Sequence, residues 1–140
     1  MQVCIVYLSK GKDSPRLRSI SEGLRKGLEG QGHNVDILNI ADSDGTRLTI
    51  YDYVIIGTEP VSFFSAGVSP SLRKFLENAG MVSGKRCMAF VSGGLRKNRL
   101  LLNLMKEMES QGMILKLSEI IRKEDEALAI GKRLNVERNY

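Results

Sequence analysis

Short apolar runs alternate along the chain with longer stretches in which apolar residues recur every three or four positions. Five of the runs are rich in Val, Ile, Leu and Tyr and have the length of buried strands. They lie at residues 2–8, 35–40, 53–57, 86–91 and 113–121. The pattern therefore predicts five short strands that belong to the core of the protein.

The stretches between these runs carry helix signals. Ser14 and Pro15 supply an N-cap and a first helical position, and Leu17, Ile20 and Leu24 follow at helical spacing. The last such stretch begins with three acidic residues and ends with two basic ones, the charge order that complements a helix dipole. We expect helices at residues 15–31, 70–79, 97–111 and 124–133, and a connector with room for a helical turn at 41–49.

Strand and helix alternate throughout the chain, with no repeat and no long linker. This alternation predicts an α/β protein in which a three-layer, doubly wound parallel sheet forms a single domain over residues 1–140. In such sheets the loops at the carboxyl ends of the strands hold the ligands. We therefore look for a site in the loops that follow the first, third and fourth strands.

Composition narrows the class of protein. The hydrophobic content of 42% and the charged content of 26% are ordinary for a globular domain. The first residues lack the features of a signal peptide, and no apolar run approaches the roughly 20 residues of a spanning helix. We expect a cytoplasmic protein without a membrane partner. The net charge of +5 leaves room for nucleic acid, but we do not expect it as the partner, because a recognition-helix motif and an aromatic array are missing.

Three segments resemble the short-chain flavodoxin-like family, which includes flavodoxins and FMN-dependent NAD(P)H:quinone oxidoreductases. They are residues 48–58 with the following Pro60 and Val61, the helical segment 72–76, and the closing segment 125–134. The resemblance extends over residues 2 to 134. It implies a flavodoxin-like fold with strand order 2-1-3-4-5 and an FMN site at the switch point between the first and third strands.

The first loop that the resemblance implies follows the strand at 2–8. In the family, its hydroxyls and backbone amides surround the FMN phosphate at the start of the first helix, where unpaired N–H groups attract an anion. The matching residues are Ser9, Lys10, Gly11, Lys12, Asp13 and Ser14. Lys12 stands at the usual Gly position and Asp13 at the usual Asn position, so a carboxylate stands where the resemblance implies that the phosphate approaches. The alternative is a capped, solvated helix start without a ligand.

The second loop follows the strand at 53–57. The resemblance implies cofactor contacts from Glu59, Pro60, Val61, Ser62, Phe63 and Phe64. The family usually has Gly-Ser/Thr-Pro, whereas this loop is one residue longer and acidic at Glu59, which would disfavour an anionic hydroquinone beside it. Phe63 and Phe64 are candidates to pack on the flavin ring. The alternative is that they cover the sheet edge and a partner surface.

The third loop follows the strand at 86–91 and resembles the loop that bonds the pyrimidine side of the flavin. Its candidate residues are Ser92, Gly93, Gly94 and Asn98. The two glycines permit a close approach of backbone to ligand, and a structural turn is the alternative explanation. No aromatic residue stands here to cover the outer face of the ring.

Basic residues gather on the first and third loops, at Lys10, Lys12, Arg16, Arg96, Lys97 and Arg99. Such a rim attracts the phosphates of a flavin or nicotinamide nucleotide, or an acidic redox protein. In the family that the sequence resembles, electron-carrier flavodoxins are usually acidic. The excess of basic residues in this chain therefore favours a reductase or another anion-binding role. The alternative is a solvated basic edge without a ligand.

The sequence gives no support for hydrolysis by a nucleophilic serine, for metal catalysis or for a disulfide. Ser92 has no base within reach, because His33, the one histidine, lies in a turn at the opposite edge of the sheet, where we expect a surface residue without partners. No metal-ligand spacing and no convincing catalytic side chain is present. Cys4 and Cys87 are predicted to be buried, free thiols, because strand order 2-1-3-4-5 separates them by about 9 to 10 Å.

Two functions from different classes follow. The first is an FMN-binding redox protein that passes electrons between a nicotinamide or protein donor and a quinone or protein acceptor, with the chemistry carried by the flavin. The second is a flavodoxin-like domain that binds no flavin and serves as a binding or interaction module. It is favoured by the departures from the family pattern at Lys12, Asp13 and Glu59.

Overall fold

The computed structural model describes residues 1–9, 14–42, 46–60 and 66–136. Its strands are β1 (Gln2–Leu8), β2 (Asn34–Asn39), β3 (Tyr53–Thr58), β4 (Arg86–Val91) and β5 (Ile114–Ile120). Its helices are α1 (Pro15–Gly30), α2 (Pro70–Glu77), α3 (Lys97–Ser110) and α4 (Glu124–Arg133), with a short 3-10 helix, η1, at Ile40–Asp42. Every predicted strand and helix is present within two residues of its expected bounds.

Several predicted bounds differ from the structure by one or two residues, and local hydrogen bonds explain two of these differences. Ile40 was expected to end the second strand but begins η1, where the side-chain oxygen of Asn39 accepts from the amide of Ala41 at 3.1 Å. The helix expected to reach residue 79 ends at Glu77. The side-chain amide of Asn78 donates to the carbonyl of Lys74 at 2.8 Å and so satisfies one of the open carbonyls at that helix end.

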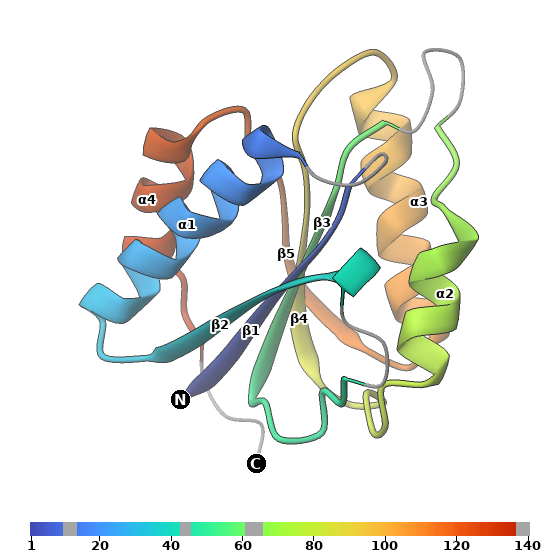
Figure 1. The fold of residues 1–140 in the computed structure, drawn as a ribbon, viewed down its shortest axis with the longest axis horizontal. Coiled ribbons are helices and arrows are strands. Elements are labelled where there is room, and N and C mark those ends of the chain that lie inside the picture. Colours follow the sequence, from blue (N-terminus) through green and yellow to red (C-terminus); the bar gives the residue numbers. More distant parts are fainter. Residues whose placement is uncertain (10–13, 43–45, 61–65, 137–140) are drawn as a thin grey trace.

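The five strands form one parallel sheet in the order β2-β1-β3-β4-β5, as predicted. Helices α1 and α4 cover one face, and α2 and α3 cover the other (Figure 1). The three central strands are buried almost along their whole length. Coverage on both faces explains why these strands appear in the sequence as continuous apolar runs.

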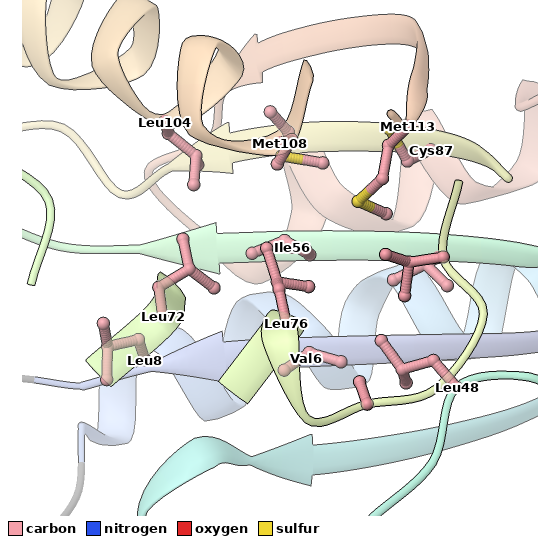
Figure 2. Close-up of a cluster of buried hydrophobic side chains, with 14 of the residues drawn as sticks. Val6, Leu8, Leu48, Ile56, Leu72, Leu76, Cys87, Leu104, Met108 and Met113 are labelled. Atoms are coloured by element: carbon pink, nitrogen blue, oxygen red, sulfur yellow. The ribbon is translucent and has the colours of Figure 1, made fainter. Parts of the chain in front are cut away.

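A core lies on each face of the sheet. On the α2 and α3 side, Leu72 and Leu76 of α2 and Leu104 of α3 pack over Val6 and Ile56 of the central strands (Figure 2). On the other side, apolar residues of α1 and α4 pack over alternate residues of the same strands. The two cores fix the positions of the strand ends, from which the candidate loops emerge.

Helices α1 and α4 approach each other closely through glycine. A Cβ atom on Gly27 would lie only 2.6 Å from the carbonyl carbon of Gly131, and one on Gly23 would lie 2.5 Å from the carbonyl oxygen of Glu124. Real Cβ atoms essentially never approach another atom so closely. The glycines therefore allow α1 and α4 to pack backbone against backbone.

The two cysteines are buried in the core between the sheet and α2 and α3, with free thiols. Cys4 and Cys87 both pair with Val54, so β3 lies between them as the strand order predicted. Burial raises the pKa of each thiol to about 12, with a smaller contribution from Asp36 at Cys4 and from Glu109 at Cys87. At neutral pH these thiols are protonated and poor nucleophiles.

Candidate functional site

The strands β1, β3 and β4 are neighbours in the sheet, and their carboxyl ends lie along its upper edge in Figure 1. The described residues at or just after these strand ends are Ser9, Ser14, Thr58–Pro60 and Ser92–Gly94. We refer to this set as the carboxyl edge. The second loop lies between the first and third because β3 separates β1 from β4.

Ser14 forms the N-cap of α1, as its sequence position predicted. Its hydroxyl oxygen accepts a hydrogen bond from the amide of Leu17 at 3.2 Å, and the residue is only 5% exposed. Pro15 has no N–H group and the amide of Arg18 donates to the carbonyl of Ser14 at 3.0 Å, so it is the dipole of α1 that gives this helix end a partial positive charge. The start of α1 is therefore a place where an anion is stabilised.

A carboxylate of the chain itself lies at that helix start. The Ser14 hydroxyl donates to Oε2 of Glu59 at 2.8 Å, and Glu59 is only partly exposed. The sequence suggested an acidic group beside a flavin ring, whereas the structure joins it to the first loop. The contact ties the ends of the first and second loops together across 45 positions of sequence.

Thr58 also holds these loops in place, although sequence reasoning did not select it. The residue is 2% exposed, and its hydroxyl donates to the carbonyl of Leu8 at 3.1 Å. Its own carbonyl accepts from the amide of Ser92 at 3.2 Å. Thr58 thus links the ends of β1, β3 and β4. Its position directly after a predicted strand was the signal that could have identified it.

The third loop has unusual backbone geometry. Gly93 and Gly94 have φ angles of 105° and 97°, and Arg96, the N-cap of α3, has a φ of 59°. Glycine suits the first two positions because it has no Cβ atom to strain in this region. A Cβ atom on Gly94 would lie 2.9 Å from Cγ of Pro60, so the third loop touches the second. The approach of a ligand to these glycines stays a prediction, and Pro60 occupies part of the space beside Gly94.

The individual candidates of this loop differ in accessibility. Ser92 is 2% exposed and Gly93 is buried, whereas Gly94 and Asn98 are exposed. Asn98 lies in the first turn of α3. The Ser92 hydroxyl is therefore not presented to solvent.

Besides Thr58, two further residues at this end of the sheet were missed by the sequence analysis. Leu95 follows the glycines and is 59% exposed, so it presents an apolar surface in a loop that has no aromatic residue. Arg122 follows β5, and its Cγ lies 3.6 Å from the position that a Cβ on Gly93 would occupy. Because β5 is parallel to β4, the residue after it reaches the same edge, which is the signal that could have found Arg122.

Four of the predicted basic residues are described. Arg16, Arg96 and Arg99 are exposed, and Lys97 is half-buried. Arg16 lies in the first turn of α1, and Lys97 and Arg99 lie in the first turn of α3. Within the described part of the chain, the positive charge expected at the carboxyl edge therefore lies at the starts of α1 and α3.

Several predicted residues lie outside the described part of the chain. They are Lys10, Gly11, Lys12, Asp13, Val61, Ser62, Phe63 and Phe64. Their roles in holding a phosphate or a flavin ring stay predictions. Within the described ranges, no three His, Cys, Asp or Glu side chains come together in a way that could hold a metal ion. In those ranges there is also no helix with the length and apolar character to cross a membrane.

His33 lies in the turn before β2, at the edge opposite the candidate loops, as expected. The prediction that it has no partner was wrong, because the amino group of Met1 lies 3.2 Å from its Nδ1. The pairing of β1 with β2 brings these two residues together. Burial, with a smaller effect of the charged amino group, lowers the pKa of His33.

Comparison with known proteins supports the fold. The sequence matches no protein-family model and no curated protein. An archaeal flavodoxin matches with a TM-score of 0.73 and 22% identity, over 95% of this chain and 92% of that one. A Streptococcus pneumonia flavodoxin matches with a TM-score of 0.71 and 16% identity, over 95% and 94%. Flavodoxin 1 of Bacillus cereus matches with a TM-score of 0.70 and 14% identity, over 96% and 100%. The chain thus has the flavodoxin-like fold.

Proposed function

We propose that the carboxyl edge binds FMN and that the protein takes part in electron transfer. The observation that carries this proposal is the position of the capped start of α1 on the same sheet edge as the glycine backbone of the third loop. In doubly wound sheets this edge is where ligands bind. The likeness to flavodoxins over nearly the whole chain gives the ligand its proposed identity.

The described residues suit the ring of the flavin. Gly94 is exposed and has no side chain to block its backbone, so its amide can bond the ring. Leu95 offers an exposed apolar surface beside it. The flavin supplies the redox chemistry when it is bound. The chain supplies position and charge, with Arg16, Arg96 and Arg99 attracting an anionic ligand.

The site suits the phosphate of FMN less well than the ring, because Glu59 already accepts a hydrogen bond from Ser14 where the phosphate would bind. Two unit negative charges 4 Å apart repel by about 4 kcal/mol at the effective dielectric near a protein surface. A helix start attracts an anion by only about 0.3–1 kcal/mol. The repulsion between Glu59 and the phosphate therefore exceeds the attraction of the phosphate by the start of α1, unless the Glu59 carboxylate moves away from Ser14. We infer that binding of FMN requires the Glu59 side chain to turn away from the start of α1.

The same contact favours a second candidate function, that of a binding module without flavin. Glu59 satisfies the Ser14 hydroxyl, and Pro60 fills the space beside Gly94, so the edge makes these contacts without a ligand. Such a module would use the exposed basic residues to bind an acidic partner. Its thermal stability would not change with FMN, since a ligand stabilises only a state that it binds.

The experiment that separates these functions is a titration of the purified protein with FMN. We expect quenched flavin fluorescence, a perturbed flavin absorption spectrum and a raised melting temperature. Riboflavin, which lacks the phosphate, serves as the matched ligand and reports how much the phosphate contributes. No spectral change at micromolar protein with excess FMN would reject the flavin-binding function and leave the module.

The electron partners follow from charge. We propose a nicotinamide nucleotide, a quinone or an acidic redox protein, because exposed basic side chains at the starts of α1 and α3 attract anions at long range. For an anionic donor such as a nicotinamide nucleotide or an acidic protein, the rate of reduction of the FMN-loaded protein should fall as salt rises.

A further inference from the structure

A cavity of about 580 Å³ lies beside the sheet, and none of the candidate loop residues is among its described lining residues. Tyr53 and Arg86, the first residues of β3 and β4, line it, so it lies toward the amino ends of the strands. The end of α4 lines it as well, through Arg133 and Leu134. We call it the amino-edge cavity. Its volume falls within the range of about 300–1,000 Å³ that is typical of ligand pockets.

The cavity lies beside an irregular part of β5 and the end of α4. The register between β4 and β5 shifts between Cys87 and Met88, so that Lys116 is an extra residue on the edge strand. Such a bulge bends the strand and re-aims its side chains. Helix α4 packs chiefly against α1, and Leu117 of β5 remains partly exposed beside the cavity.

The lining combines positive charge with apolar surface. Arg86, Lys116 and Arg133 contribute three positive charges, and Glu119 contributes one negative charge. Leu117, Ile130 and Leu134 provide the apolar part of the wall. Among the described lining residues, the net charge of +2 beside an apolar wall suits a small ligand that has an anionic group on an apolar body.

Tyr53 provides an independent sign of a ligand. The residue is 1% exposed, and among the described residues its hydroxyl has no hydrogen-bond partner. A buried hydroxyl without a partner costs free energy, and proteins rarely leave one unsatisfied. Burial raises the pKa of Tyr53, so at neutral pH the hydroxyl is protonated and can donate. A ligand oxygen in the cavity would accept this hydrogen bond.

We propose that the amino-edge cavity binds a small organic anion. The anionic group is attracted by Arg86, Lys116 and Arg133 and accepts a hydrogen bond from Tyr53. The apolar body lies against Leu117, Ile130 and Leu134. This site is separate from the carboxyl edge and does not depend on FMN binding there.

The test compares two aromatic probes of nearly the same shape, the 2-naphthoate anion and neutral 2-naphthamide. Both are titrated into the ¹⁵N-labelled full chain while amide shifts are followed. We expect saturable shifts at Tyr53, Arg86, Lys116 and Leu117 with naphthoate, and binding of naphthamide that is at least about fivefold weaker, since hydrogen bonds to charged groups are the stronger ones. The absence of saturable shifts at these amides, or equal binding of the two probes, would overturn the proposal.

Three variants make the test specific. Tyr53→Phe removes a hydroxyl that has no partner among the described residues, so the variant should fold; we expect naphthoate to bind about two- to tenfold more weakly. Arg133→Gln should weaken binding about two- to fivefold. Lys106→Gln, at an exposed position on α3, is the control and should bind as the wild type does. Unchanged affinity in either Tyr53→Phe or Arg133→Gln would overturn the proposal.

Discussion

The two candidate functions give different roles to Glu59. Its carboxylate accepts the hydrogen bond of Ser14 at the start of α1, where the phosphate of FMN would bind. Glu59→Gln removes the negative charge but keeps an acceptor for Ser14. We expect this variant to bind FMN about tenfold more tightly at low salt, because part of the charge repulsion is lost. Fluorescence titration gives the two dissociation constants.

The matched control is Glu77→Gln, at an exposed position near the end of α2. It changes the net charge by the same amount but leaves the carboxyl edge intact, so it should bind FMN with nearly the affinity of the wild type. Equal affinity of Glu59→Gln and the wild type would show that Glu59 does not compete with the phosphate. An equal gain in both variants would point to net charge alone.

Individual residues were predictable from sequence where their roles are local. The cap at Ser14 and the burial of Cys4 and Cys87 follow from neighbouring residues and intrinsic preferences. The bond between Ser14 and Glu59 was not predictable, because it joins side chains from two loops that are far apart in sequence. The contact of His33 with Met1 was missed for the same reason.

At the scale of elements, the packing of α1 against α4 depends on glycine. Gly27→Ala would place a Cβ atom 2.6 Å from backbone atoms of Gly131 and Lys132, which cannot rotate away as a side chain can. We expect overpacking of about 2–3 kcal/mol to exceed the gain of about 1 kcal/mol in helix propensity. The free energy of unfolding, measured in urea, should therefore fall by about 1–2 kcal/mol.

Gly30→Ala in the same helix is the control. A Cβ atom there would have no neighbour within 4 Å, so this variant should be as stable as the wild type or slightly more stable. Equal effects of the two substitutions would mean that the contact between α1 and α4 is looser than the structure indicates.

The extents of strands and helices were predictable because apolar spacing and caps are local signals. The exceptions are Ile40 and the residues after Glu77, where side-chain amides of Asn39 and Asn78 bond the backbone and change the helix bounds. Such bonds compete with regular structure, and periodicity alone does not reveal them. The irregularity in β5 could not be predicted from the sequence either, because it depends on the register of β5 against β4.

For the whole molecule, the alternation of strands and helices predicted the layers, and the resemblance implied the strand order β2-β1-β3-β4-β5. That order brings the ends of β1, β3 and β4 together and so locates the carboxyl edge. The amino-edge cavity was not predictable, since its lining depends on how the start of β3, the edge strand β5 and the end of α4 come together in space. The fold alone does not determine which of the two proposed functions the protein has.

The location of bound FMN tests the central claim most directly. Amide shifts of the ¹⁵N-labelled protein should be recorded during a titration with FMN. The proposed function predicts saturable shifts at the amides of Ser14, Gly93 and Gly94, with those of Lys116 and Leu117 unchanged. An absence of saturable shifts, or shifts confined to the amino-edge cavity, would contradict flavin binding at the carboxyl edge.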